Sequence, residues 1–147
     1  VGLLMTYPGV PSVYYGDEIG MSGDGLLARG CMIWDEPALD TDLRAFYKTL
    51  IHLRRTSPAL IAGGFQILLV EENTLAYLRD SDEEQIIVIA HRGPGERPAN
   101  PLPVAHAALP DGLQMIELFS RRSATITNGY LPLAAMMPGV EIWKTGA

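Results

Sequence analysis

The sequence contains a single cysteine, Cys31, which excludes an intrachain disulfide and leaves the compartment of the protein open. Its three histidines lie far apart and lack the spacing of metal ligands: His52, His91 and His106. Asp24-Gly25 by itself is a weak calcium signal, because Ca²⁺ takes roughly six to eight oxygen ligands. We therefore expect no metal site and no cofactor.

Long hydrophobic runs and stripes of basic residues are also missing. No apolar stretch approaches the roughly 18 residues of a membrane helix, so we expect no membrane partner. Hydrophobic residues make up 48% and charged residues 19% of the 147 residues, as in ordinary globular proteins, and the net charge is −6. The arginine pairs 54–55 and 121–122 form no continuous patch, so we expect no nucleic-acid partner. The first ten residues have neither an initial Met nor a basic region, and we interpret them as part of a longer protein.

What the sequence does contain falls into two regions that meet near residue 62. In the first region, residues 3–5 are typical of the last turn of a helix that Pro8-Gly9 stops. Residues 12–15 predict a strand that is apolar on both faces, as in a parallel sheet covered by helices. Residues 16–36 predict a loop of unusual length, and such loops are usually functional.

A helix is predicted over residues 41–55, with Asp40 or Thr41 as its cap and Pro58 at its end. The side chains at helical spacing on its apolar face are Leu43, Phe46, Tyr47, Leu50 and Ile51. Arg54 and Arg55 lie at the negative end of the helix dipole. Since the chain offers no second βα unit, its first sixty residues are interpreted as the final βα unit of a larger repeat.

The second region predicts β-structure. Its short apolar or alternating runs, divided by turn clusters, are residues 65–70, 74–78, 85–90, 114–119 and 140–144. Because no helix pattern separates them, they indicate an antiparallel β-sandwich of Greek-key type. The proline-rich residues 93–103 predict a surface connection between strands. The predicted fold class is mixed α and β, with a βα unit over residues 1–61 and a sandwich over residues 62–147.

The most specific motif is GVPSVYYGDEIGM, residues 9–21. It resembles the segment around the eighth barrel strand of the α-amylase superfamily, glycoside hydrolase family 13, which reads G-x-P-x-x-Y-Y-G-[DE]-E. The next residues, MSGDGLLARGCMIWDE, resemble the family's loop G-M-x-G-x-x-D-P-x-x-R-x-P-M-x-W. The matching positions are Gly9, Pro11, Tyr14, Tyr15, Gly16, Asp17, Glu18, Gly20, Met21, Gly23, Arg29, Met32 and Trp34. LIHLRRTSPAL, TLAYLRD and QIIVIAHR are similar to the family's last barrel helix and to its C-terminal β-sandwich, domain C.

The loop motif also departs from the family pattern. Gly25-Leu26 stands where the family has Asp-Pro, with Asp24 one place early, and Gly30-Cys31 stands where Arg-Pro is common. In many relatives that Asp and the Arg of the motif hold sugar hydroxyls. The resemblance therefore implies that Arg29, and Asp24 less directly, bind substrate.

Asp17 and Glu18 cannot be the pair of carboxylates that a retaining glycosidase needs. Such a pair lies about 5–5.5 Å apart across the scissile bond, whereas neighbouring side chains on extended backbone point to opposite faces. In the resembled family the catalytic acids lie on earlier strands, so we expect no catalytic residue in this chain. We interpret Gly16, Asp17 and Glu18 as structural residues of an active-site loop, with Glu18 pinning the loop through hydrogen bonds. Tyr14 and Tyr15 are interpreted as core residues, and Trp34 is expected to pack the loop against the last helix rather than to stack on a sugar.

The resemblance implies the C-terminal portion of an enzyme that cleaves or transfers α-glucosidic bonds, with an α-glucan or maltooligosaccharide as its partner. The GDEIGM version of the motif is closest to neopullulanase, cyclomaltodextrinase and α-glucosidase members. Two alternatives stay open: a stand-alone carbohydrate-binding module, and a non-enzymatic subunit that shares the barrel. Because one strand and one helix cannot cover their own apolar surface, we expect residues 1–61 either to self-associate or to dock on the sandwich.

Overall fold

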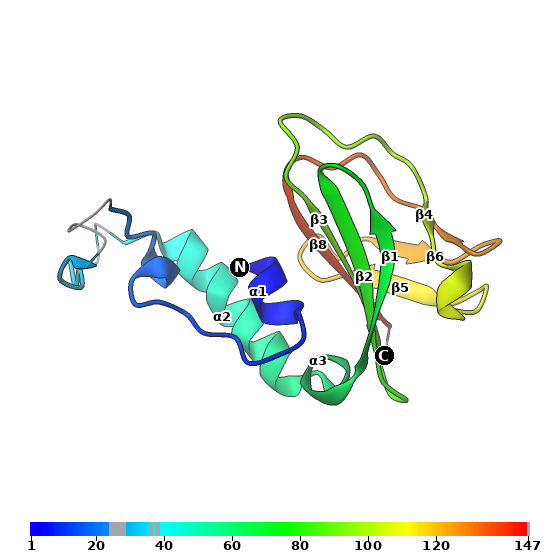
Figure 1. Cartoon of the computed structure of the whole chain (residues 1–147), viewed down its shortest axis with the longest axis horizontal. Coiled ribbons are helices and arrows are strands. Elements are labelled where there is room, and N and C mark those ends of the chain that lie inside the picture. Colours follow the sequence, from blue (N-terminus) through cyan, green and yellow to red (C-terminus); the bar gives the residue numbers. More distant parts are fainter. Residues whose placement is uncertain (24–28, 36, 38, 147) are drawn as a thin grey trace.

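The structure is a computed structural model that describes residues 1–23, 29–35, 37 and 39–146. Figure 1 shows a helical region on one side of the molecule and a β-domain on the other. The helices are α1 (Gly2–Thr6), α2 (Thr41–Thr56) and α3 (Pro58–Ala62), with short 3₁₀ turns η1 (Asp17–Ile19) and η4 (Ala105–Ala107). The strands are β1 (Gly64–Val70), β2 (Thr74–Asp80), β3 (Gln85–His91), β4 (Leu102–Pro103), β5 (Gln114–Glu117), β6 (Ser123–Thr125), β7 (Tyr130–Leu131) and β8 (Gly139–Thr145).

Six strands form one antiparallel sheet in the order β1-β2-β3-β8-β5-β6, and β4 pairs with β7 in a small second sheet. The last strand of the chain, β8, thus returns over a long connection to lie between β3 and β5. The predicted mixed class with a mostly antiparallel sheet is confirmed. The five predicted β runs all contain strands, whereas the short strands β4, β6 and β7 were not predicted.

The strand predicted over residues 12–15 is wrong for the described structure, where these residues form no ladder with another segment. A strand is stabilised by hydrogen bonds to a neighbour, and every strand described here pairs within residues 64–145. The apolar residues of this stretch therefore run as unpaired backbone between α1 and η1.

The helix predicted over residues 41–55 is confirmed as α2, and Asp40 is its cap. The Leu43 N–H donates to Asp40 Oδ1 over 2.8 Å. On its apolar face Leu50 is fully buried, but Ile51 is exposed, and the buried Leu53 takes the place that we expected for Ile51. Pro58 does follow the end of α2, yet it also begins α3, because proline suits the first position of a helix.

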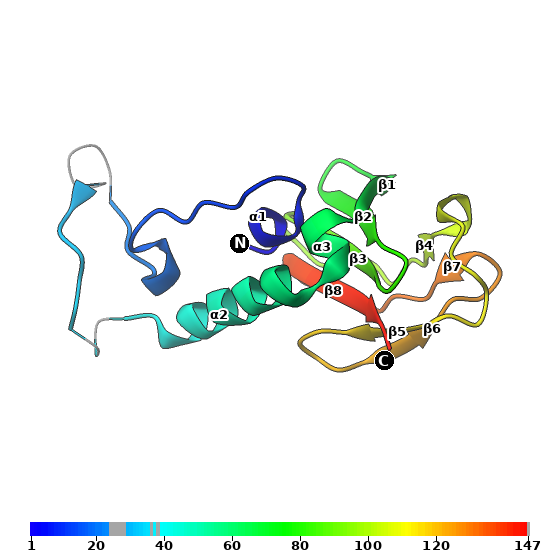
Figure 2. The same ribbon diagram turned by 90° about the horizontal axis from the view of Figure 1, so that it is seen from below.

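The sheet is apolar on both faces because successive side chains of a strand point to opposite sides. On one face the buried side chains of Ile87, Ile89 and Trp143 pack with residues from β4, β7 and the connecting loops. On the other face Ile86, Val88 and Ile142 pack against the three helices. Figure 2 shows α1, α2 and α3 together on that second face. The docking of residues 1–61 on the sandwich is thus observed.

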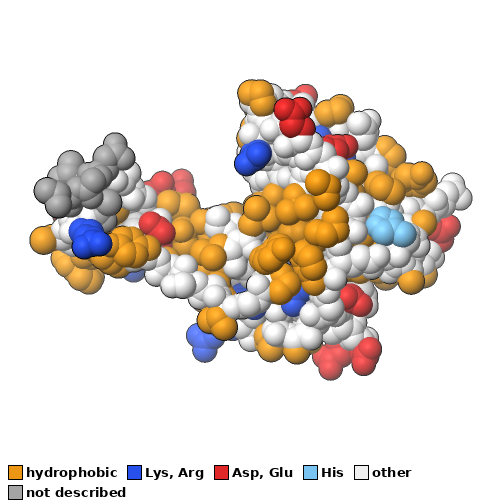
Figure 3. All heavy atoms as spheres, in the orientation of Figure 1, with side chains coloured by type: hydrophobic (Ala, Val, Ile, Leu, Met, Phe, Trp, Pro, Cys, Tyr) orange, Lys and Arg blue, Asp and Glu red, His pale blue; other side chains and the backbone are white. Residues whose placement is uncertain are grey.

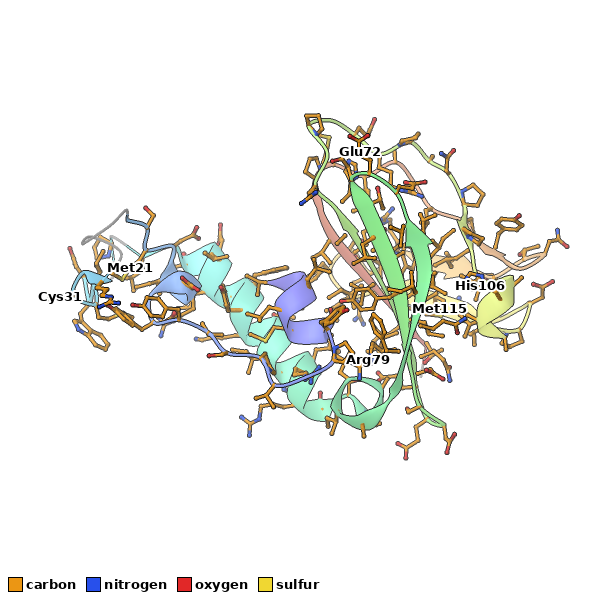
Figure 4. All side chains as sticks on the ribbon, viewed as in Figure 1. Met21, Cys31, Glu72, Arg79, His106 and Met115 are labelled. Atoms are coloured by element: carbon orange, nitrogen blue, oxygen red, sulfur yellow. The ribbon has the colours of Figure 1, made fainter. Side chains whose placement is uncertain are left out.

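Arg79 fastens the helical region to the sheet. Its side chain is almost fully buried and donates to four backbone carbonyls. Nη1 donates to Thr6 O over 2.9 Å, Nε to Gly64 O over 2.9 Å, and Nη2 to Leu60 O and Gly63 O over 3.2 and 3.1 Å. Figure 4 shows Arg79 between α1, α3 and the sheet. One guanidinium therefore joins the end of α1, the end of α3 and the start of β1.

Within the described residues, none of the helices combines the length and the apolar character needed to cross a bilayer.

Candidate functional site

The loop that carries the two motifs begins with a sharp turn at Gly16. Its φ of 89° lies in the left-handed region, and a Cβ at this position would fall 2.5 Å from the sulfur of Met21. The Gly16 carbonyl accepts from the Met21 N–H over 2.9 Å, and the Gly16 N–H donates to Glu18 Oε2 over 2.9 Å. The carboxylate of Glu18 is therefore engaged in holding the turn.

Asp17 and Glu18 lie on the 3₁₀ turn η1 and not on extended backbone. The argument that their side chains point to opposite faces of a strand was therefore wrong. Burial raises the pKa of Tyr47 on α2, and the nearby Asp17 and Glu18 carboxylates add to the rise. The turn η1 thus packs close to α2.

A second set of contacts fixes the loop to the start of α2. The Asp40 N–H donates to Ile19 O over 3.2 Å, and the Ile19 side chain is buried. Gly20 has a φ of 78°, and a Cβ there would lie 3.2 Å from the Asp40 Cβ. The residue that caps α2 therefore also anchors the end of η1.

Trp34 of the loop and the two tyrosines directly before the loop are exposed. The Tyr14 and Tyr15 rings lie 4.7 Å apart with half of each side chain in solvent, and Trp34 is 82% exposed. The Tyr15 hydroxyl donates to Gly30 O over 3.0 Å, and a hydrogen bond with Tyr14 raises the pKa of Tyr15. The expectations of core tyrosines and of a packed Trp34 are wrong for this chain, because all three side chains are exposed.

Arg29 is exposed on the same loop, and Asp24 lies outside the described residues. Figure 4 places Met21 and Cys31 of the loop together at the end of the molecule farthest from the sheet. Over the described residues, no three His, Cys, Asp or Glu side chains come close enough to hold a metal ion. The structure thus brings Arg29 and the exposed ring of Trp34 to one protruding loop, with Tyr14 and Tyr15 directly before it, while the contact of Arg29 or Asp24 with substrate stays a prediction.

Arg54 positions the chain that leads into the loop, and sequence reasoning missed this role. We expected it only to complement the helix dipole, but Nη1 donates to Tyr7 O over 3.0 Å and Nη2 to Gly9 O over 2.5 Å. The signal was present in Pro8-Gly9, since a tight turn after a helix leaves carbonyls in need of donors.

No known protein-family model matches the chain. Among curated proteins, the chain is 32% identical over 143 residues to a cyclomaltodextrinase of Geobacillus thermopakistaniensis. This match covers 95% of the chain and 24% of the relative. It is 47% identical over 87 residues to a cyclomaltodextrinase of a Bacillus species, covering 57% of this chain and 16% of the relative. A solved cyclomaltodextrinase structure matches with a TM-score of 0.83 and 33% identity, over 99% of this chain and 24% of that one.

The chain therefore spans about a quarter or less of the length of these relatives. The resemblance to the C-terminal portion of α-amylase-superfamily proteins, expected from the motifs, is confirmed.

Proposed function

We propose that this chain is the C-terminal part of an enzyme that hydrolyses or transfers α-glucosidic bonds in α-glucans with retention of configuration. The observation that carries the proposal is the similarity to cyclomaltodextrinases, which extends over nearly the whole chain in both sequence and structure. It includes the loop as well as the sandwich, so the likeness is not confined to a common β-fold.

Residues 1–61 are assigned to the end of a (β/α)₈ barrel, as its eighth strand, active-site loop and eighth helix, and residues 62–147 to domain C. In the intact protein, residues 12–15 would gain a neighbouring strand and thereby the ladder that they lack here. The exposure of Tyr14 and Tyr15 supports this assignment, because a barrel strand is covered on both faces.

The loop is assigned to the wall of the sugar-binding cleft, since active sites of such barrels lie at the C-terminal ends of the strands. Arg29 and Asp24 would hold sugar hydroxyls, and the exposed ring of Trp34 on the same loop offers a flat apolar surface. No catalytic residue is assigned to this chain, because the catalytic acids of the resembled family lie on earlier strands. The Glu18 carboxylate is moreover engaged with the Gly16 N–H. The nucleophile and the acid/base belong to the remainder of the protein.

The test compares the intact protein with the 147-residue chain on maltodextrins, pullulan and aryl α-glucosides. The intact protein is expected to turn over at least one of them, and the chain alone none. Turnover by a pure sample of the chain would overturn the assignment of the catalytic acids. An intact protein that binds maltooligosaccharides without turnover would instead be the non-enzymatic subunit.

The role of Arg29 is tested in the intact protein with Arg29→Ala, using the exposed sandwich residue Arg92→Ala as the matched control. Arg29→Ala should raise KM for longer maltooligosaccharides about tenfold, as the loss of one charge-assisted contact does, with an unchanged melting temperature. A lowered melting temperature with unchanged kinetics would assign Arg29 a structural role.

A stand-alone carbohydrate-binding module has less support. The exposed aromatic residues described on the sandwich are Phe119 and Tyr130, and the Phe119 ring stacks on Phe46 of α2 at 4.9 Å. A single free tyrosine is a small platform for a sugar chain. Retention of residues 62–147 on insoluble starch would favour this alternative.

A further inference from the structure

The turn that leads into β7 contains the only Asn-Gly pair of the sequence. Of the three asparagines, Asn73 precedes a threonine, Asn100 precedes a proline, and Asn128 precedes Gly129. An asparagine side chain deamidates when the backbone nitrogen of the next residue attacks its carbonyl carbon, Cγ. Glycine leaves that nitrogen unhindered because it has no side chain, whereas proline offers no N–H. Asn128 is therefore the asparagine of this chain with the greatest intrinsic tendency to deamidate.

The Asn-Gly pair forms a tight hairpin turn. Thr127 and Tyr130 exchange both backbone hydrogen bonds over 3.0 Å, and the residues between them have positive φ, 51° at Asn128 and 75° at Gly129. Positive φ at both central positions is typical of the type I′ turn, which Asn-Gly favours. Asn128 is exposed, and Figure 2 shows β7 at the end of the β-domain opposite the helices. Water therefore reaches the side chain that would react.

Asp111 binds both N–H groups of this turn. The Asn128 N–H donates to Asp111 Oδ2 over 3.0 Å, and the Gly129 N–H donates to Asp111 Oδ1 over 2.9 Å. Hydrogen bonds to a carboxylate are stronger than those between neutral groups. The Gly129 nitrogen must lose its proton when it attacks, and the negative charge of the carboxylate opposes that loss. The hydrogen bond thus protects the nitrogen that would start the reaction.

The Gly129 carbonyl is held from another side. It accepts from the Val104 N–H over 2.8 Å and from the Ala105 N–H over 3.0 Å. A Cβ at Gly129 would lie 2.7 Å from the Ala105 Cβ. Figure 3 shows this end of the molecule with an exposed histidine, which Figure 4 labels as His106 of the adjoining 3₁₀ turn η4. Ring closure requires the backbone at Asn128 to rotate, and contacts that fix both the N–H and the carbonyl of Gly129 restrict that rotation.

We propose that Asn128 is a deamidation site which Asp111 protects in the folded chain, so that Asn128 is modified only when the turn opens. The site lies in the β-domain and does not depend on the proposed function. Local openings of exposed turns cost much less free energy than global unfolding. The rate of deamidation is therefore set by how firmly Asp111 holds the two N–H groups.

The reaction needs only water. The Gly129 nitrogen gives up its proton and forms a bond to Cγ of Asn128, and the side-chain amide takes up a proton and leaves as ammonia. Water then opens the cyclic imide at either of its carbonyls, which gives aspartate or isoaspartate at position 128. In sum, one water is consumed and one ammonia is released, and no group is oxidised or reduced.

The isoaspartate product would disturb the strand that follows. Tyr130 pairs with Pro103 and Leu131 with Leu102, and both leucines are fully buried. Isoaspartate adds a methylene group to the backbone of the turn, and the length of a hairpin turn fixes the register of its strands. Isoaspartate at position 128 should therefore weaken the pairing of β4 with β7 and lower the melting temperature of the chain.

The protection is tested by following deamidation with peptide mass spectrometry at mildly alkaline pH. In Asp111→Ala, Asn128 should deamidate at least about fivefold faster than in the unchanged chain, because two charge-assisted hydrogen bonds are lost. The matched control is Asp82→Ala in the exposed turn between β2 and β3, which should leave the rate unchanged. An equal or slower rate in Asp111→Ala, or an equal acceleration in both variants, would overturn the proposal.

An unfolded reference keeps the test decisive even where Asp111→Ala does not fold. In a synthetic peptide of residues 122–134, Asn128 should deamidate at least about tenfold faster than in the folded 147-residue chain. Equal rates in the peptide and the folded chain would show that the turn gives no protection and would overturn the proposal.

The product is tested by its stability. The deamidated chain carries an additional negative charge, so ion exchange separates it from the unmodified chain. Its isoaspartate form is then compared with Asn128→Asp, which has the same charge and an unaltered backbone. The isoaspartate form should melt at the lower temperature. Equal melting temperatures would refute the predicted effect on β4 and β7.

Discussion

The two faces of the six-stranded sheet are covered in different ways. On the face that carries Trp143, every buried partner comes from residues 68–143, so this core is closed within the β-domain. On the face that carries Ile142, the buried partners include Met5, Leu50 and Leu60 from the helical region. The helices in turn present a bare outer side. Of the sixteen large hydrophobic side chains that are exposed among the described residues, eleven lie in residues 1–61.

The two regions thus differ in how much of their apolar surface is covered. Burying apolar surface stabilises the folded state by about 25 cal/mol per Å², and the sheet of the β-domain buries apolar side chains on both of its faces. The helical region buries apolar side chains mainly on the side that faces the sheet. Its outer side, with Val10 at 97% and Trp34 at 82% exposure, is where the remainder of the protein is expected to bind.

The largest effect is expected from Arg79→Met, which breaks the join between the regions. Burial lowers the pKa of the Arg79 guanidinium, and the four carbonyls that it binds lose their donor in the variant. Leaving them unpaired should cost on the order of 3–5 kcal/mol of unfolding free energy. Urea unfolding of the 147-residue chain measures this loss of unfolding free energy. The exposed Arg92→Met, as control, should change the free energy by less than about 0.5 kcal/mol. Equal effects of the two variants would contradict a fastening role for Arg79.

Two neighbours on α2 sharpen the comparison between the sides of the helix. Leu50 is fully buried against the sheet, and Ile51 is 37% exposed on the outer side. Leu50→Ala should cost about 2–4 kcal/mol through lost burial and a cavity, and Ile51→Ala under about 1 kcal/mol. Thermal or urea unfolding of the 147-residue chain measures both. A reversed order would mean that α2 docks through another face.

Alkaline pH should lower the stability of the chain through Tyr77, which lies in the core that the helices share with the sheet. Burial raises the pKa of Tyr77 to about 12, whereas the unfolded chain has the ordinary value near 10. The folded state therefore holds its proton more tightly. This contribution is complete below about pH 10 and is lost as pH rises from about 10 to 12, by about 2–3 kcal/mol. Urea unfolding between pH 8 and about 12 measures the loss, and Tyr77→Phe should flatten it. An unchanged slope in the variant would remove Tyr77 as the cause.

The smallest effect on stability is expected on the loop. Because Trp34 is 82% exposed, Trp34→Ala should change the unfolding free energy of the 147-residue chain by under about 0.5 kcal/mol. The same substitution in the intact protein should weaken maltooligosaccharide binding, which titration calorimetry measures. A large loss of stability in the chain alone would show that Trp34 packs on the helix after all.

The sequence predicted those elements whose causes are local. The Asp40 cap and the apolar stripe of α2 are signals of a few residues, and the β runs are marked by alternation and turns. The short strands β4 and β7 could not be predicted, because each has two residues and is defined only by its pairing with the other. The strand predicted at residues 12–15 is wrong for the converse reason, since a strand needs a neighbour and no described segment pairs with these residues.

At the candidate site, too, features with local causes could be predicted and features that depend on distant residues could not. The glycines of the loop could be interpreted from the motif, and Gly16 indeed takes a left-handed conformation. The buried role of Arg79 was missed, because a guanidinium that binds carbonyls distant in sequence leaves no local pattern. The exposure of Trp34 depends on what is absent around it, which no local pattern records.

The most direct measurement is a urea titration of the 147-residue chain followed by two probes. Far-UV circular dichroism reports the helices, and in a Trp34→Phe background the fluorescence of the buried Trp143 reports the closed core of the sheet. Since the helices share a core with the sheet, both signals should fall in one transition with the same midpoint. A hydrophobic dye should still bind the native chain, through its bare outer side. Loss of the helical signal at lower urea while Trp143 stays buried would contradict the shared core. A native chain that binds no dye would contradict the uncovered apolar surface on the outer side of the helices.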